Sequence, residues 1–103
     1  MVEVRVIERA LSDIEAIGEF ISRDSEKYGK LTVQGIFETI RYLTEFPEIG
    51  RVVPEANIKS IREVFYGNYR IIYFTISKKR IDVIAIHNSA QLLTKTHIKK
   101  RKK

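Results

Sequence analysis

The chain has 103 residues, a formal net charge of +6 and 44% hydrophobic residues, which fits one small domain with a single core. It contains no cysteine, and this excludes a disulfide framework and a thiolate metal site. The N-terminal residues lack a basic start followed by a long apolar core, and no apolar stretch approaches the roughly 18 residues of a membrane span. We therefore expect a cytoplasmic protein with no membrane partner.

Charge is distributed unevenly along the chain. Residues 95–103 carry six Lys or Arg and no acid, whereas residues 1–94 balance 13 basic against 13 acidic groups. We therefore predict a single domain over residues 1–94 and a basic, mobile C-terminal tail over residues 95–103. Within the domain, residues 1–50 hold 6 basic and 10 acidic groups, and residues 51–80 hold 7 basic and 2 acidic groups. This asymmetry suits a polyanionic partner on the second half, although a solvated charged surface explains it equally well.

The first half of the chain predicts one strand and two helices. Valines at positions 2, 4 and 6 alternate with polar residues, as in a strand buried on one face. Apolar residues recur at helical spacing over residues 10–21, and this helix should end near Arg23. Asp24 or Ser25 can cap a second helix that Phe46-Pro47 ends, and its apolar stripe comprises Tyr28, Leu31, Ile36, Phe37, Ile40 and Leu43. So short a connection predicts an antiparallel helical hairpin.

The second half predicts a loop and a sheet. Residues 47–60 contain two prolines and a glycine with little periodicity, so they form a surface loop. Residues 60–88 contain three apolar runs separated by two turn signals, which is typical of an antiparallel meander. The expected fold is α+β, with a mostly antiparallel four-stranded sheet and an N-terminal two-helix hairpin packed on one face.

The second turn of the meander fixes a register. A two-residue loop at Lys78-Lys79 sets Ser77 opposite Arg80, and it therefore sets Arg70 opposite His87. Side chains alternate along a strand, so the face that carries Arg70 should also carry Ile72, Phe74 and Ile76, opposed by Ala85, Val83 and Ile81.

The first turn allows two registers. A two-residue loop at Gly67-Asn68 places Glu63 on the face of Arg70, whereas a three-residue loop with Asn68 in the left-handed region places Arg62 there. We predict the three-residue loop, and with it a basic groove on the face of the sheet opposite the helices.

The order of elements and six segments, ALSDIEAIGEFI, FPEIGR, VPE, IREV, GNYRIIY and VIAIHN, resemble the RelE/ParE superfamily of toxins over about residues 2–93. The resemblance implies a small toxin that a cognate antitoxin holds inactive. RelE-like and YoeB-like members cleave messenger RNA in the decoding site of the ribosome, whereas ParE-like members poison DNA gyrase. The implied partners are thus an antitoxin, together with either DNA gyrase or the ribosome with its mRNA.

The resemblance also implies candidate catalytic residues. Arg70 falls on the catalytic arginine of nuclease members, His87 lies near their catalytic histidine, Glu55 resembles their loop glutamate, and Arg62 falls near a basic position used on the scissile phosphate. In such a nuclease Glu55 would be the base, Arg70 with Arg62 would stabilise the phosphorane, and His87 would be the acid. Each residue also has an ordinary interpretation, as a strand-end cation, a hydrogen-bonded histidine or a loop ion pair.

Three further residues are candidate substrate contacts. Arg51 and Lys59 belong to the loop over residues 47–60, and Tyr69 could stack a nucleobase. Metal binding is not expected, because His87 and His97 are the only histidines and no acidic cluster accompanies them. We expect no cofactor.

Departures from the nuclease pattern favour the ParE-like branch slightly. Nuclease members usually supply Arg or Tyr after the histidine, and this chain has Asn88, Ser89 and Ala90 there. The helical hairpin, the VPE loop and the IREV strand are similar to ParE-like members. The first prediction is a growth-arresting toxin that poisons gyrase. The alternative is a ribosome-dependent mRNA endoribonuclease, so enzymatic activity stays open. A third possibility is a non-catalytic nucleic-acid or protein-binding module that binds through its basic tail.

Overall fold

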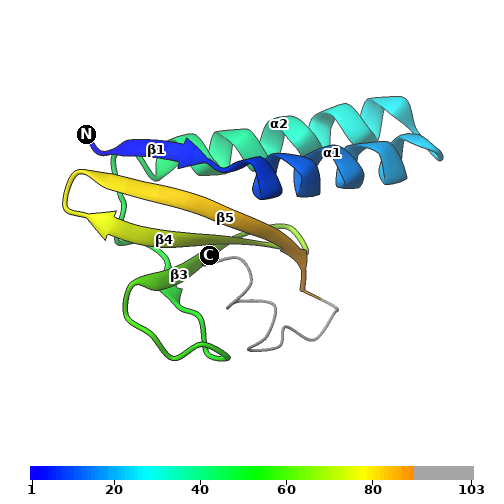
Figure 1. Ribbon diagram of the computed structural model, residues 1–103. Helices are drawn as coiled ribbons and strands as arrows, with labels where there is room; N and C mark the ends of the chain where they lie inside the picture. The colour runs from blue at the N-terminus through cyan, green and yellow to red at the C-terminus, as the bar shows by residue number, and fades with distance from the viewer. Residues whose placement is uncertain (90–103) are drawn as a thin grey trace.

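Two helices lie against one face of a twisted sheet in the computed structural model, which describes residues 1–89 (Figure 1). The elements in chain order are β1 (Glu3–Val6), α1 (Glu8–Ser22), α2 (Glu26–Tyr42), β2 (Arg51–Val52), β3 (Ile61–Tyr66), β4 (Tyr69–Ser77) and β5 (Arg80–Asn88). The predicted α+β class and the N-terminal hairpin are confirmed. The predicted tail and the boundary at residue 94 lie outside the described residues and stay predictions.

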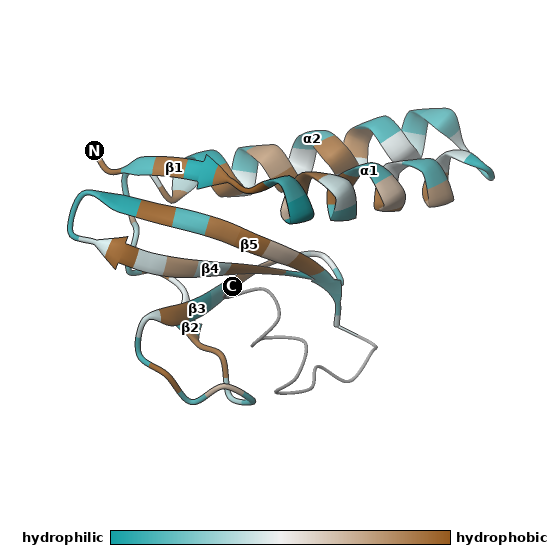
Figure 2. Cartoon of the chain, viewed as in Figure 1, coloured by the Kyte–Doolittle hydropathy of each residue, from teal (hydrophilic) through white to brown (hydrophobic). Residues whose placement is uncertain are grey.

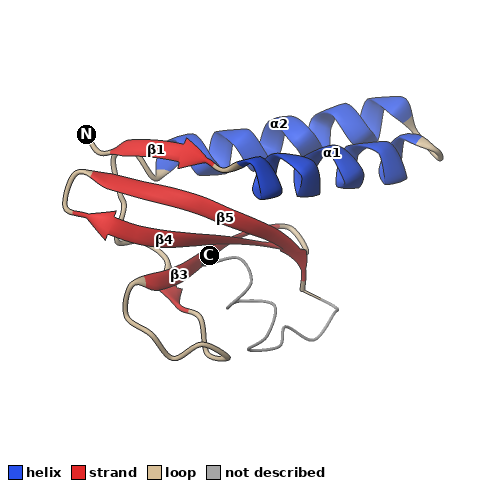
Figure 3. Cartoon of the chain, in the orientation of Figure 1, coloured by secondary structure: helices blue, strands red, loops and turns tan. Residues whose placement is uncertain are grey.

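The sheet has five strands in the order β1-β5-β4-β3-β2, one more than predicted (Figure 3). β1 pairs in parallel with β5 through residues 80–83, and the other neighbours are antiparallel. A parallel pair requires a crossover connection, and the helical hairpin is the first part of the connection from β1 to β5. The additional strand is β2, which has only two residues and pairs with Arg62 and Glu63 of β3.

Local signals account for most helix boundaries. α1 ends at Ser22, one residue before the predicted end. Ser25 caps α2, because its Oγ accepts a hydrogen bond from the backbone N–H of Tyr28 at 3.1 Å. α2 ends at Tyr42, before the predicted stop at Phe46-Pro47. Tighter turns replace the helix there, as in the 3.0 Å bond from the Leu43 N–H to the Ile40 carbonyl.

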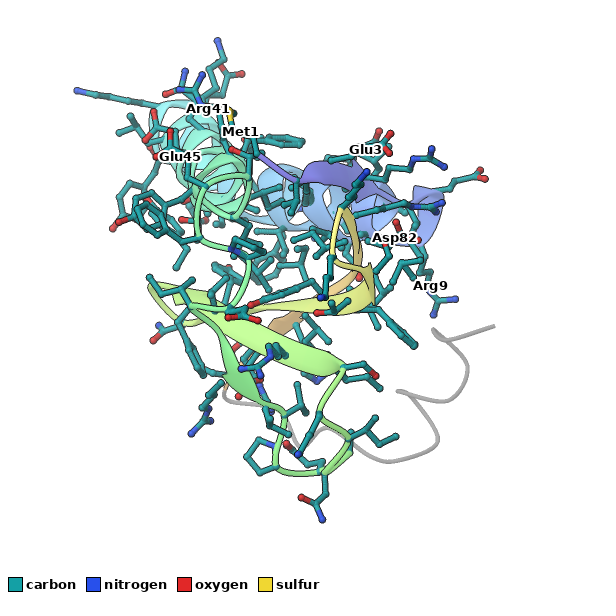
Figure 4. All side chains as sticks on the ribbon, turned by 90° about the vertical axis from the view of Figure 1, so that its left-hand side faces the viewer. Met1, Glu3, Arg9, Arg41, Glu45 and Asp82 are labelled. Atoms are coloured by element: carbon teal, nitrogen blue, oxygen red, sulfur yellow. The ribbon has the colours of Figure 1, made fainter. Side chains whose placement is uncertain are left out.

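The main core lies between the hairpin and the sheet, where apolar side chains fill the space and charged residues such as Arg9 and Arg41 lie outside (Figure 4). From the helices it takes Ala10, Ile14, Ile36, Ile40 and Leu43, and from the sheet Ile71, Tyr73, Ile81, Val83 and Ile86. The predicted stripe of α2 is therefore correct at its isoleucines and at Leu43. Its other three members, Tyr28, Leu31 and Phe37, are exposed.

Two glycines permit close approach or a tight turn. A Cβ at Gly35 of α2 would overlap the ring of Tyr66, so the absence of a side chain lets the end of β3 lie directly on the helix. Gly67 has φ +56° at the first position of the β3–β4 turn, a conformation that glycine adopts without steric penalty.

The second hairpin confirms part of the predicted register. Ser77 pairs with Arg80, and Arg70 pairs with His87. Between these points the register shifts by one residue between Ser77 and Thr75 and shifts back between Tyr73 and Ile72, so that Tyr73 pairs with Val83 while both end pairs agree with the prediction. The prediction that Ile81 and Val83 share the face of Arg70 is therefore wrong, because both lie in the core beneath the helices. Figure 2 shows the change along β5, where alternating hydropathy gives way to an apolar run.

The first hairpin has the two-residue loop that we did not favour. Tyr66 pairs with Tyr69, which leaves Gly67 and Asn68 as the loop. Positive φ at the first loop residue is the type II′ requirement, whose twist matches that of the strands. Glu63, and not Arg62, consequently shares the face of Arg70.

Candidate functional site

The face of the sheet opposite the helices carries four charged side chains that three ion pairs join in a row: Arg51 of β2, Glu63 of β3, Arg70 of β4 and Glu55 of the β2–β3 loop. We call these four residues the ionic cluster. Beside it lies a second, smaller apolar core, made of Val53, Ile61, Ile72, Ile84 and Ala85. The loop reaches this face because Val53 and Ala56 pack on that core.

Arg70 is the centre of the ionic cluster. Its side chain is only 8% exposed, and both edges of its guanidinium are bonded to carboxylates. Nη1 and Nη2 each donate to one oxygen of Glu55 at 2.8 Å, and Nε donates to Oε1 of Glu63 at 2.6 Å. Such a paired fork fixes a carboxylate geometrically as well as electrostatically. Arg70 thus joins a loop and a neighbouring strand to β4.

Glu63 is a fully buried carboxylate shared by two arginines. Its second oxygen accepts a 2.7 Å hydrogen bond from Nε of Arg51, whose side chain is 61% exposed. The Arg51 guanidinium also lies 5.4 Å from the centroid of the Phe65 ring, within cation–π range. A buried acid is tolerated only when it is paired, and here Glu63 has a partner on each side.

The pairing alters proton affinities. The hydrogen bonds from Arg70 lower the pKa of Glu55 to about 2, against the smaller opposing effect of burial. Glu55, and then Glu63, raise the pKa of Arg70 in turn. Both groups are therefore charged throughout the physiological range, and Glu55 has little affinity for a proton.

The structure brings some of the predicted site residues together and separates others. Arg70, Glu55 and Arg51 meet in the ionic cluster, and half-buried His87 lies directly opposite Arg70 on β5. Their catalytic or substrate-binding roles stay predictions.

Arg62 and Tyr69 lie elsewhere. Arg62 precedes Glu63 on β3 and therefore points to the other face, where its Nη1 donates to the Gly50 carbonyl at 2.8 Å. Tyr69 packs against the main core on that same side. Lys59 is exposed in the loop. The predicted partnership of Arg62 with Arg70 on one phosphate therefore has no geometric support.

Sequence reasoning missed Glu63 as a member of the site, although the sequence did contain a signal. An acid inside an apolar strand is unusual, and it requires a cation on the same face. The predicted three-residue loop at the β3–β4 turn placed Glu63 on the face opposite Arg70, so the cation that this acid requires was not identified.

The ionic cluster neutralises much of the positive charge expected on this face. Two arginines and two glutamates sum to zero, and the fork of Arg70 is occupied. Residues 1–89 contain no group of three or more His, Asp or Glu side chains that could hold a metal ion. Over the same range, no helix is long and apolar enough to cross a membrane.

A helical hairpin over a sheet whose meander carries the motifs GNYRIIY and VIAIHN is the arrangement of small RelE/ParE-type toxins. A family model described as "ParE toxin of type II toxin-antitoxin system, parDE" matches residues 4–93, and the chain belongs to this family. It is the toxin of a toxin-antitoxin pair, and an antitoxin is its partner.

A solved structure shares the fold of this chain. A chain from "Chromosomal ParDE TA system from P. aeruginosa" is similar with a TM-score of 0.70 and 18% sequence identity, covering 85% of this chain and 96% of that chain. Identity at this level shows the shared fold alone. A comparison with curated proteins found no match.

Proposed function

We propose that this toxin arrests growth in the cytoplasm by poisoning DNA gyrase, and that an antitoxin encoded beside it neutralises it. The family supports the proposal, because gyrase is the target implied by the ParE-like branch. The observation that favours it over mRNA cleavage is the bidentate Arg70–Glu55 ion pair.

That ion pair is unfavourable for the alternative, cleavage of mRNA. A general base works best when its pKa lies near the working pH, and Glu55 has a pKa of about 2. A phosphate-stabilising arginine must offer its fork to the substrate, and both edges of Arg70 are bonded to carboxylates. Arg62, the second proposed phosphate contact, lies on the opposite face.

One observation favours the nuclease as the second candidate. His87 faces Arg70 across the β4–β5 ladder, as an acid beside a phosphate-binding arginine would.

Two assays run in parallel test the proposal. Purified toxin should inhibit supercoiling by DNA gyrase, and primer extension on a message translated in vitro should show no codon-positioned cuts. The antitoxin should relieve the inhibition. The nuclease alternative would replace the proposal if message cleavage occurred, disappeared in His87→Ala, and left supercoiling unaffected.

A further inference from the structure

The β2–β3 loop, residues 53–60, projects from the sheet on the side away from the helices (Figure 1). It has no regular secondary structure, yet hydrogen bonds and packing restrain it along its length. Loops held on a rigid scaffold are frequent sites of recognition. The way in which this loop is held indicates what its tip can do.

Backbone hydrogen bonds close the loop on itself and on the sheet. The Val53 N–H donates to the Ile61 carbonyl at 3.0 Å, and the Val53 carbonyl accepts from Asn57 at 2.9 Å. On the return side, the Ile58 carbonyl accepts from Ile61 at 3.0 Å. The loop is thus two consecutive turns.

Side chains provide a second set of anchors. Val53 is fully buried in the second core, and Ala56 packs against the same residues. Glu55 is held by the guanidinium of Arg70 through two 2.8 Å hydrogen bonds. Arg70 therefore acts on the loop as a positioning residue.

The restrained loop presents an unusual tip. Asn57 has φ +51°, a left-handed conformation that is uncommon outside glycine and that persists where the surroundings enforce it. The next two residues are Ile58, a large apolar side chain that is 39% exposed, and Lys59, which is also exposed. An exposed apolar side chain at the end of a restrained loop can serve as an anchor that fills a pocket on a partner.

Charge around the tip favours a protein pocket over nucleic acid. Arg51 and Arg70, the cations of the adjoining face, are neutralised by Glu63 and Glu55. A hollow of about 940 Å³ lies beside the loop, and its charged lining residues are Glu45, Glu48, Lys59, Arg62 and Lys78. The hollow thus carries charges of both signs, which the surface of a protein partner can match.

We propose that the tip of the β2–β3 loop, Asn57 to Lys59, is the recognition element through which this toxin binds its folded protein target. Ile58 enters an apolar pocket, and Lys59 pairs with a carboxylate at the rim. The Glu55–Arg70 ion pair holds the tip in the binding conformation, which lowers the ordering cost of association. This inference rests on the proposed function and names the surface that it uses.

The test compares two tip variants, Ile58→Asp and Lys59→Glu, with two variants that make the same changes on the exposed face of α2, Leu31→Asp and Lys30→Glu. Each full-length toxin is assayed for growth arrest, for the concentration that half-inhibits purified DNA gyrase, for thermal midpoint and for co-purification with the co-expressed antitoxin. The tip variants should raise the half-inhibitory concentration about tenfold or more, at an unchanged midpoint and with antitoxin binding retained. The α2 variants should inhibit gyrase like the wild type.

A further variant tests the anchor. Glu55→Gln should weaken inhibition by less than the tip variants do, and it should accelerate hydrogen exchange at the Asn57 amide, which bonds to the Val53 carbonyl. Unchanged exchange at this amide would contradict the positioning role of Arg70.

The outcomes separate this inference from the proposed function. If the wild type and the folded tip variants arrest growth equally well, the inference that the loop tip recognises the target is overturned and the proposed function stands. Tip variants that no longer bind the antitoxin and no longer inhibit gyrase would assign the loop to antitoxin binding. If the wild-type toxin bound DNA without gyrase, with a steep salt dependence that the tip variants lacked, the loop would be assigned to nucleic acid. Either result overturns the proposal. A wild type harmless to growth and gyrase would overturn the proposed function and the recognition loop with it.

Discussion

Replacing Arg70 with methionine should destabilise the fold through the carboxylate that it leaves behind. The Glu63 side chain is fully buried, and Arg70 supplies one of its two ion pairs at 2.6 Å. Removing one partner of a buried ion pair costs about 3–5 kcal/mol, because the other charge stays buried. Arg51 still pairs with Glu63 at 2.7 Å, but its side chain is largely exposed. We therefore expect a loss of about 3 kcal/mol, near the lower end of that range.

Urea denaturation followed by circular dichroism measures this loss. The exposed Arg5–Glu3 pair, whose side chains are 53% and 54% accessible, is the matched control, and Arg5→Met should cost less than about 1 kcal/mol. Adding Glu63→Gln to Arg70→Met should restore part of the stability, because a neutral amide does not require a cation. An Arg70→Met protein within about 1 kcal/mol of the wild type would refute the reasoning, as would a double variant that recovers nothing.

Three other perturbations have expected outcomes. The folded-state pKa of Glu55, about 2, lies below its ordinary value of 4.5, so the contribution of Glu55 to folding stability is complete above pH 4.5 and is lost as pH falls towards 2. Urea denaturation at pH values across this range should show a loss of about 1–2 kcal/mol after allowance for solvent screening. The Glu55→Gln variant should show a weaker dependence of stability on pH. Gly35→Ala should lower the thermal midpoint because its Cβ overlaps Tyr66, and in a Tyr66→Val background the same change should be neutral or stabilising, as alanine favours helix. Tyr73→Phe should cost about 1–3 kcal/mol in urea denaturation, since it leaves the buried Gly50 N–H without its acceptor; a midpoint equal to that of the wild type would contradict this.

The parts of the fold that the sequence predicts depend on strong local signals. The apolar runs of the meander and the polar loop at Lys78-Lys79 are sufficient to place Ser77 opposite Arg80. Helical spacing and the cap at Ser25 are sufficient for the hairpin. These features require only neighbouring residues, so one sequence can specify them.

The errors arise where the outcome depends on distant residues. The two-residue strand β2 has no periodicity of its own, because its position depends on β3. The one-residue shift between Ile72 and Tyr73 of β4 has no turn or glycine to indicate it. In the first hairpin the choice between Gly67 and Asn68 as the left-handed residue reversed the faces of Arg62 and Glu63. The predicted loop therefore placed Glu63, one of the two carboxylate partners of Arg70, on the wrong face.

The resemblance to a family located the position of Arg70 and Glu55 without predicting that they bind each other. Motifs place residue types along a chain, and a catalytic pair and an ion pair require the same two types. Only the distances distinguish them. The bidentate geometry, with two hydrogen bonds of 2.8 Å, shows that these two residues are bound to one another in this chain.

β4 fixes the segment around β2 from both faces of the sheet, although β3 lies between them. On the helical face the Tyr73 hydroxyl donates to the Pro47 carbonyl at 2.8 Å and accepts from the Gly50 N–H at 3.0 Å. On the other face Arg70 reaches across to Glu55. A strand of two residues has too few ladder bonds to set its own position, so these two side chains determine where β2 begins and where the loop after it points. The arginine at position 70 therefore serves the placement of the loop, with both edges of its fork bonded to carboxylates.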